Sequence, residues 1–262
     1  MDYKLFLTFT VLSTIVLSVI TYKSAFVNGK PHCNNFVTNV YLYLACAIAL
    51  SACFVHLYNI ILNTSSKRGI LFSEIDAFIQ IYPYMWLAII ISFISIIVLS
   101  IQDVFGKDGT LLNHSAWLIF LASISLTIYP IFKSKELHTI VQKSLLATIL
   151  IFLLMSGIVY AYPEFFATTY KKVMTALLIA LIAIIITELF LILTGTYDRG
   201  TYNMISFGVI ALFSLYISYD TSRIFDYAKK CINSPNYPKV STKLFLDVMN
   251  IFMRIVGVSR RN

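Results

Sequence analysis

The sequence predicts an all-α polytopic membrane protein. Of its 262 residues, 59% are hydrophobic and 12% are charged, which is more apolar surface than a soluble domain can cover. The apolar runs are continuous, and most reach or approach the roughly 20 residues that a helix needs to cross a bilayer. A membrane β-barrel is disfavoured, because its strands would alternate apolar and polar residues over about ten positions.

Eight charge-poor stretches predict seven or eight helices. They cover residues 5–20, 37–62, 81–101, 115–132, 145–162, 173–193, 204–219 and 242–258. The first stretch is short, so a cleaved signal peptide is the alternative to an extra N-terminal helix, although Ser24-Ala25 is a poor cleavage site. We expect residues 1–36 to form an N-terminal hydrophobic segment and loop, and residues 37–262 to form a transmembrane helical bundle with a central C-terminal helix.

Several classes of chemistry find no support in the sequence. It contains no GxxxxGK[ST], GxGxxG or HExxH motif, and no nucleophile and base stand at a readable spacing. We therefore expect no enzyme activity and no cofactor. The net charge of +8 favours anionic lipid headgroups as partners of a membrane protein, and nucleic acid is not expected as a partner.

The four cysteines lack the spacing of a zinc or redox site. Cys46 and Cys53 lie two turns apart in one expected helix, where they are most simply small packing residues. Cys33 and Cys231 lie in loops that an eight-span arrangement places on one side of the membrane. A bridge between these two is therefore an open alternative.

Two aspartates in apolar surroundings near the C-terminus are the strongest functional candidates. Asp220 and Asp247 each interrupt an expected membrane helix, and a carboxylate at bilayer depth costs about 2.5–3.5 kcal/mol on insertion scales. In the last helix, the polar residues recur at helical spacing and form one stripe, which cannot face lipid: Lys243, Asp247, Asn250 and Arg254. The preceding helix repeats the pattern with Tyr216, Asp220, Arg223 and Tyr227. A local pair of Asp220 with Arg223 is the structural alternative to a functional role.

Glu188 is a further intramembrane acid, enclosed almost wholly by apolar neighbours. Such an acid is a functional candidate by default, so Glu188 is a candidate for lining a pathway, as is Asn250 on the last helix. The alternative for Glu188 is a protonated carboxyl that is hydrogen-bonded to a neighbouring helix.

Three segments resemble the signature of the Bax inhibitor family. Residues 212–224 match a Tyr-x-x-Tyr-Asp-x-x-x-Ile helix, and residues 244–252 match a Leu-x-x-Asp-x-x-Asn-x-Phe helix. Residues 123–131 are similar to the small-Ile-Thr-Leu-x-Pro-Ile stretch of the family's third helix. The resemblance implies a seven-helix bundle from Val37 onward, which leaves the N-terminal residues as an extension.

The resemblance also implies a function. Family members form a calcium-permeable leak in an intracellular or bacterial membrane, and animal and viral relatives damp cell death by lowering stored calcium. On this basis Asp220 and Asp247 are expected to act as a pH sensor pair, hydrogen-bonded across adjacent helices, and as transient ligands of the permeating calcium ion. The physics agrees, because two carboxyls held close together in a low dielectric cannot both ionise cheaply.

A basic residue holds the first aspartate in closed members of the family. Ungapped counting from Pro130 lands near Lys107, in a loop that looks solvated, and Arg223 and Arg254 are the other candidates for this gating role.

The sequence therefore predicts a pH-sensitive calcium leak that inhibits apoptosis, in the endoplasmic reticulum or Golgi membrane, or in the plasma membrane of a bacterium. Calcium, protons and cell-death regulators of the membrane are the expected partners. A proton-coupled transporter using Glu188, Asp220 and Asp247 is the main alternative, and a non-conducting interaction protein is another. We expect a cytosolic C-terminus, and the sequons at Asn63 and Asn113, which flank one span, cannot both be lumenal.

Overall fold

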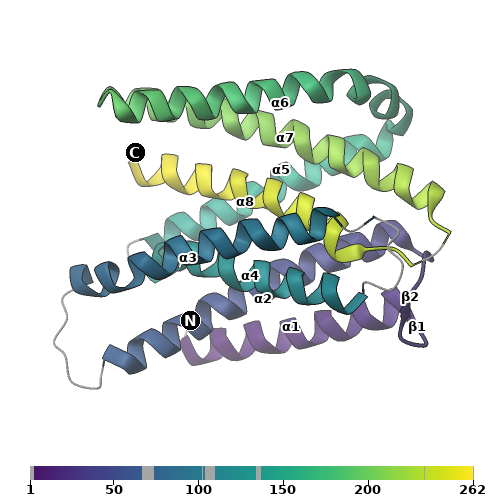
Figure 1. The fold of residues 1–262 in the computed structure, drawn as a ribbon, viewed down its shortest axis with the longest axis horizontal. Helices are drawn as coiled ribbons and strands as arrows, with labels where there is room; N and C mark the ends of the chain where they lie inside the picture. The colour runs from purple at the N-terminus through teal and green to yellow at the C-terminus, as the bar shows by residue number, and fades with distance from the viewer. Residues whose placement is uncertain are drawn as a thin grey trace. The chain divides into compact units, whose positions relative to one another are not determined.

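The computed structural model describes residues 3–66, 74–101, 103, 110–133, 137–232 and 234–261. The described regular structure consists of eight helices and one short β-hairpin, which confirms the all-α class (Figure 1). In chain order the elements are α1 (Tyr3–Ala25), β1 (Phe26–Val27), β2 (Lys30–Pro31), α2 (Phe36–Ser66), α3 (Glu74–Ile101), α4 (Thr110–Lys133), α5 (His138–Ala161), α6 (Pro163–Leu193), α7 (Arg199–Lys230) and α8 (Tyr237–Arg261). The extra N-terminal helix expected from residues 5–20 is α1.

The chain divides into two compact units. Unit 1 comprises Met1–Lys135 and Cys231–Thr242, and unit 2 comprises Glu136–Lys230 and Lys243–Asn262. In unit 1, α1 packs on α2, and α4 packs on both α2 and α3. In unit 2, α7 packs on both α5 and α6.

A tight hairpin joins α1 to α2 in unit 1. Asn28 and Gly29 both have positive φ angles, of 52° and 73°, and the flanking residue pairs are antiparallel. An Asn-Gly pair of this kind suits a two-residue hairpin turn, because both central residues of a type I′ turn need positive φ. The turn returns the chain directly to the start of α2.

Side-chain caps define the starts of α7 and α8. The Asp198 carboxylate accepts a hydrogen bond from the Thr201 backbone N–H at 3.0 Å and caps α7. The Asn236 side-chain oxygen accepts one from the Lys239 backbone N–H at 3.1 Å and caps α8. Pro163, at the first position of α6, needs no hydrogen-bond partner there, since it has no N–H.

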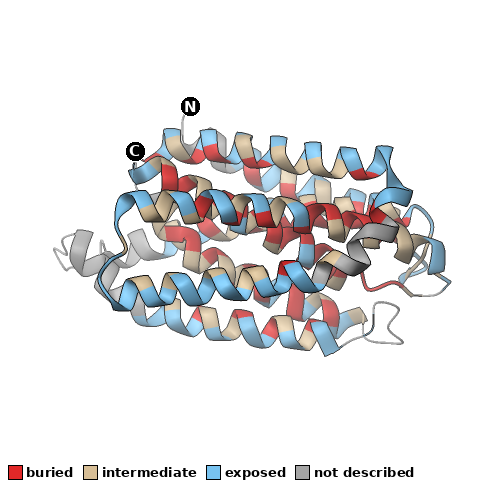
Figure 2. Ribbon diagram, turned by 90° about the horizontal axis from the view of Figure 1, so that it is seen from above, coloured by how far each residue is buried: buried red, intermediate tan, exposed pale blue. Residues whose placement is uncertain are grey.

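The core of unit 2 is built where α5, α6 and α7 meet. Its buried members are Val159, Phe166, Leu177, Leu212 and Tyr216. Single helices carry a buried and an exposed face (Figure 2). On α6 the exposed face is strongly apolar and includes Ile179, Ile182, Ile186, Leu189 and Phe190. Exposed apolar side chains of this density suit contact with lipid rather than with water.

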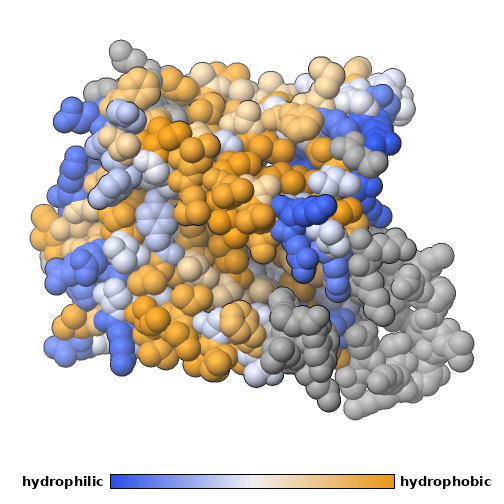
Figure 3. All heavy atoms as spheres, turned by 180° about the vertical axis from the view of Figure 1, so that it is seen from behind, coloured by the Kyte–Doolittle hydropathy of each residue, from blue (hydrophilic) through white to orange (hydrophobic). Residues whose placement is uncertain are grey.

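Seven described helices, α1 to α7, are long and apolar enough to cross a membrane. Apolar side chains dominate the middle of the face seen in Figure 3, and hydrophilic ones gather towards its edges. The chain is therefore an integral membrane protein. Helix α8 is not among the seven, and it is the helix that carries the predicted polar stripe.

Candidate functional site

Asp220 and Asp247 lie in unit 2, on α7 and α8. Asp247 is buried, with 6% of its surface exposed, and Asp220 is half-buried. The Asp220 charge acts on Asp247, so the two carboxyls lie within each other's electrostatic field. Within the described part of the chain, no hydrogen bond joins them, and the Asp247 Oδ2 atom has no hydrogen-bond partner. In this structure the two carboxyls therefore interact through their charges and not through a hydrogen bond.

The hydroxyl of Tyr216 adds a third polar group to the pair. Tyr216 lies one turn before Asp220 on α7 and belongs to the core of unit 2. Its buried hydroxyl lacks a hydrogen-bond partner within the described residues, and both aspartates act on it electrostatically. Buried polar atoms are seldom left unpaired, because each costs about 1–3 kcal/mol. One such atom on Asp247 and another on Tyr216 make this the candidate site among the described residues.

Lys243 supplies a positive charge to this site. It lies one turn before Asp247 on α8, and its charge acts on both aspartates. The i, i+4 spacing placed Lys243 on the polar stripe, but sequence reasoning did not select it as a partner of Asp220. Only the fold brings α7 and this part of α8 within range of each other.

Of the three residues predicted as gating partners, Arg223 acts on Asp220 by its charge. Arg223 also forms an ion pair with Asp226, with Nη1 and Oδ2 3.6 Å apart, and lies 5.1 Å from the centroid of the Tyr227 ring. Lys107 lies outside the described residues. The structure places the third candidate, Arg254, elsewhere.

Arg254 binds Glu188 in a bidentate ion pair between α8 and α6. Its Nη1 donates to Oε1, and its Nη2 donates to Oε2 at 2.6 Å. The Tyr197 hydroxyl, from the α6–α7 loop, donates to Oε1 of the same carboxylate at 2.6 Å. Burial, followed by the accepting carboxylate, raises the pKa of Tyr197 to about 12, which keeps the hydroxyl protonated and donating. Glu188, which the sequence predicted as pathway lining, therefore accepts three hydrogen bonds and is paired with a guanidinium.

A cation–aromatic contact continues this cluster along α8. The Arg261 guanidinium lies 3.7 Å from the centroid of Tyr202, and the rings of Tyr197 and Tyr202 meet edge-on at 5.7 Å. Gly257 makes the approach possible, since a Cβ atom there would lie 1.9 Å from the Tyr202 hydroxyl oxygen. The sequence signal for this cluster is weak: two tyrosines beside a loop and one glycine on the facing helix.

Asn250 is exposed, between Asp247 and Arg254 on the same stripe, and donates to the Leu246 carbonyl oxygen at 2.8 Å. No group of three or more His, Cys, Asp or Glu side chains that could hold a metal ion is found among the described residues. The acidic donor set at the aspartates is two carboxylates, which suits weak and reversible binding of a hard cation rather than a resident metal.

Comparison with known proteins identifies the family. The family model described as "Inhibitor of apoptosis-promoting Bax1" matches residues 33–260, which includes both aspartates and leaves all of α1 outside. A search of curated proteins returned no match to the chain. The helical architecture and the sequence motifs agree with the family match. The chain belongs to the Bax inhibitor family.

Proposed function

We propose that this protein is a pH-sensitive calcium leak channel of an intracellular membrane, which lowers stored calcium and thereby inhibits apoptosis. Its seven apolar helices and its family membership support a membrane protein related to the inhibition of apoptosis. The observation that carries the finer proposal is the buried Asp247 oxygen, which lacks a hydrogen-bond partner within the described chain and lies in the field of Asp220.

The proposed mechanism uses the two carboxyls as a proton-controlled cation site. When both are ionised, their oxygens are the hard ligands that calcium prefers, and two carboxylates bind weakly enough for the ion to leave again. When they share a proton, the site loses charge and its affinity for calcium falls. Protons and calcium therefore compete for Asp220 and Asp247.

Lys243 sets the balance of this competition. Its ammonium acts on both carboxyls, so it offsets part of their negative charge whenever no calcium is bound. A tethered cation of this kind makes the ionised pair less costly to bury, but it also opposes the entry of a second cation.

The engagement of Glu188 argues against the main alternative, a proton-coupled transporter. A carboxylate that accepts two guanidinium hydrogen bonds and one from Tyr197 is stabilised in its charged form, which disfavours its protonation. A proton relay from Glu188 to the aspartates would therefore have to begin at a carboxylate that already accepts three hydrogen bonds.

The test is calcium flux into proteoliposomes, measured from about pH 5 to 8, where a carboxyl pair in a low dielectric is expected to respond. The native chain should pass calcium down its gradient without a co-substrate, with a rate that depends on pH. Asp220→Asn combined with Asp247→Asn should abolish this pH dependence. Glu164→Gln, at an exposed carboxyl in the first turn of α6, is the control and should leave the flux unchanged.

Two outcomes would overturn the proposal. Saturable, proton-driven uptake of another solute would indicate a transporter. Full protection of cells by the doubly substituted chain would indicate a non-conducting protein that acts through cell-death regulators in the bilayer. The proposed location, the endoplasmic reticulum or Golgi membrane, is where a calcium store is available to leak, and lipids are the other expected partners.

A further inference from the structure

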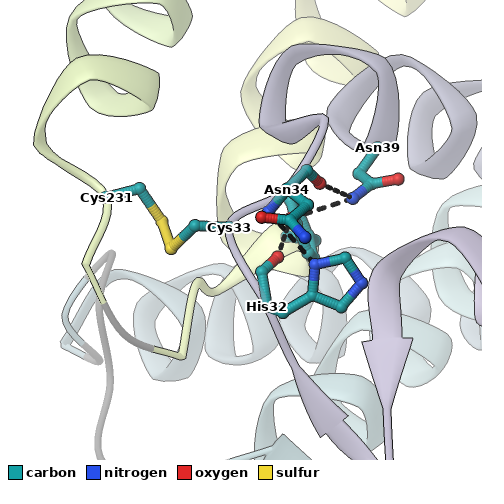
Figure 4. The surroundings of a disulfide bond; sticks show 6 residues. His32, Cys33, Asn34, Asn39 and Cys231 are labelled. Carbon is teal, nitrogen blue, oxygen red and sulfur yellow. Dashed lines mark hydrogen bonds between the residues drawn. A yellow bond between two sulfur atoms is a disulfide. The ribbon is translucent and has the colours of Figure 1, made fainter.

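A disulfide in unit 1 joins two segments that are distant in the sequence (Figure 4). Cys33 follows the β-hairpin, and Cys231 follows the last residue of α7, so 198 positions separate them. Their Cα atoms lie 5.7 Å apart, within the range of ordinary disulfides. The positions of the two cysteines in the sequence left a bridge between them as an open alternative, and the structure contains this bond.

Non-covalent contacts hold the same two segments together. The Tyr237 hydroxyl, at the start of α8, donates to the His32 carbonyl oxygen at 2.5 Å and accepts from the Asn39 side-chain nitrogen at 3.0 Å. Asn39 also donates to the Asn34 carbonyl oxygen at 2.9 Å. Tyr237 and Asn39 are both fully buried. The cysteines therefore meet because the surrounding backbone is organised on both sides of them.

The count of membrane spans agrees with this contact. Among the described residues, six helices that can cross a membrane, α2 to α7, lie between Cys33 and Cys231. An even number of crossings returns the chain to the side on which it started. Both cysteines lie outside these spans, so both belong to one face of the membrane.

We propose that the Cys33–Cys231 disulfide forms in the cell and that the face carrying it lies in an oxidising compartment, the lumen of the secretory pathway or the cell exterior. Disulfides persist in such compartments and are rare in the reducing cytosol. The two thiols lose two protons and two electrons by exchange with oxidised glutathione, whose disulfide is reduced to two glutathione thiols. This inference does not depend on the proposed calcium leak.

The orientation of the other loops follows from the proposal. The end of α2, with the sequon at Asn63, and the α6–α7 loop, with Tyr197, lie one and five crossings away from Cys33, on the cytosolic side. Asn63 therefore carries no glycan. Asn113 lies on the oxidising side but is 4% exposed within α4, so it is a poor acceptor as well. The native sequons thus report nothing about the topology, and an introduced one is needed.

Counting thiols in the native full-length chain tests the bond. Cells are lysed into denaturant with a thiol-alkylating reagent that adds polyethylene glycol, with and without prior reduction. The native chain should take up two labels without reduction, at Cys46 and Cys53, and four after it. Cys33→Ser should take up three labels in both cases, whereas Cys46→Ser, the matched control, should take up one and then three. Four labels on the unreduced native chain would overturn the proposal.

The orientation is tested in sealed vesicles from the same cells. A reductant that cannot cross the membrane should leave the bond intact until the vesicles are permeabilised. A sequon introduced after Gly29 in the hairpin should be glycosylated, and one introduced after Gly195 in the α6–α7 loop should not. Reduction in sealed cytosol-side-out vesicles, or a glycan on the α6–α7 loop, would contradict the assignment.

Discussion

The ion pair between Glu188 and Arg254 should be the strongest single polar contact between α8 and α6. The exposed fractions of the two side chains are 15% and 24%, so solvent screens the pair only partly. Two charge-assisted hydrogen bonds contribute about 1.5–3 kcal/mol each before losses from side-chain ordering and partial exposure. We therefore expect a coupling free energy of about 3 kcal/mol, or roughly 100-fold in the folding equilibrium.

A double-mutant cycle isolates this coupling. The variants are Glu188→Gln, Arg254→Gln and the combination, and the free energy of unfolding is measured in mixed micelles by circular dichroism as denaturing detergent is added. The double substitution should destabilise the fold by less than the sum of the two single substitutions, because each single substitution leaves one charge buried and unpaired.

Arg223 and Asp226 provide the matched control. They stand at i, i+3 on α7 with 3.6 Å between Nη1 and Oδ2 and are more exposed, so their coupling should be about 0.3–0.5 kcal/mol. If the coupling between Glu188 and Arg254 is no larger than that between Arg223 and Asp226, the expectation is refuted. The ion pair would then not stabilise the contact between α8 and α6.

Four further substitutions have defined outcomes. Tyr237→Phe should lower the thermal unfolding midpoint, at a cost of about 1–3 kcal/mol, because a buried hydroxyl with two hydrogen bonds is lost; an unchanged midpoint would count against it. Gly208→Ala should stabilise α7 by about 0.5–1 kcal/mol, since nothing lies within 4 Å of a Cβ atom added there. Gly257→Ala must displace the Tyr202 ring and should lower the unfolding midpoint in the same assay. Equal midpoints for the two variants would contradict the close approach of Tyr202 to Gly257. Lys243→Met should raise calcium flux near neutral pH, because a charge that opposes cation entry is removed, and reduced flux would argue for a positioning role instead.

Helical spacing predicted which residues share a face, but it did not predict which helix that face meets. The stripe with Asp247 and Arg254 was visible because polar residues recur at helical intervals in an apolar segment. The partner of Arg254 was predicted differently: Arg254 was a candidate for holding Asp220, whereas it binds Glu188, which lies 66 positions away in the sequence. The fold assigns Arg254 to Glu188 and leaves Lys243 and Arg223 to act on Asp220.

The disulfide likewise depends on a contact between segments that are distant in the sequence. The expected span count left a Cys33–Cys231 bridge as an open alternative, and the packing around Tyr237 brings these two cysteines together. One local sequence signal bears on the position of Cys33: Asn28-Gly29 is a strong turn pair, and it predicts the hairpin that places Cys33 beside the start of α2. Local sequence patterns thus predict turns and the polar faces of helices, whereas contacts between distant segments can be identified only from the folded structure.

The central claim is that Asp220 and Asp247 act as one proton-binding unit. Infrared difference spectroscopy of the carboxyl stretch, on the native chain and on each single asparagine variant in lipid, measures this directly. We expect one protonated carboxyl in the native chain that ionises as the pH is raised, and a shifted transition in Asp220→Asn and in Asp247→Asn alike. A transition that stays unchanged in one of the two variants would show that the carboxyls titrate independently and would contradict the account.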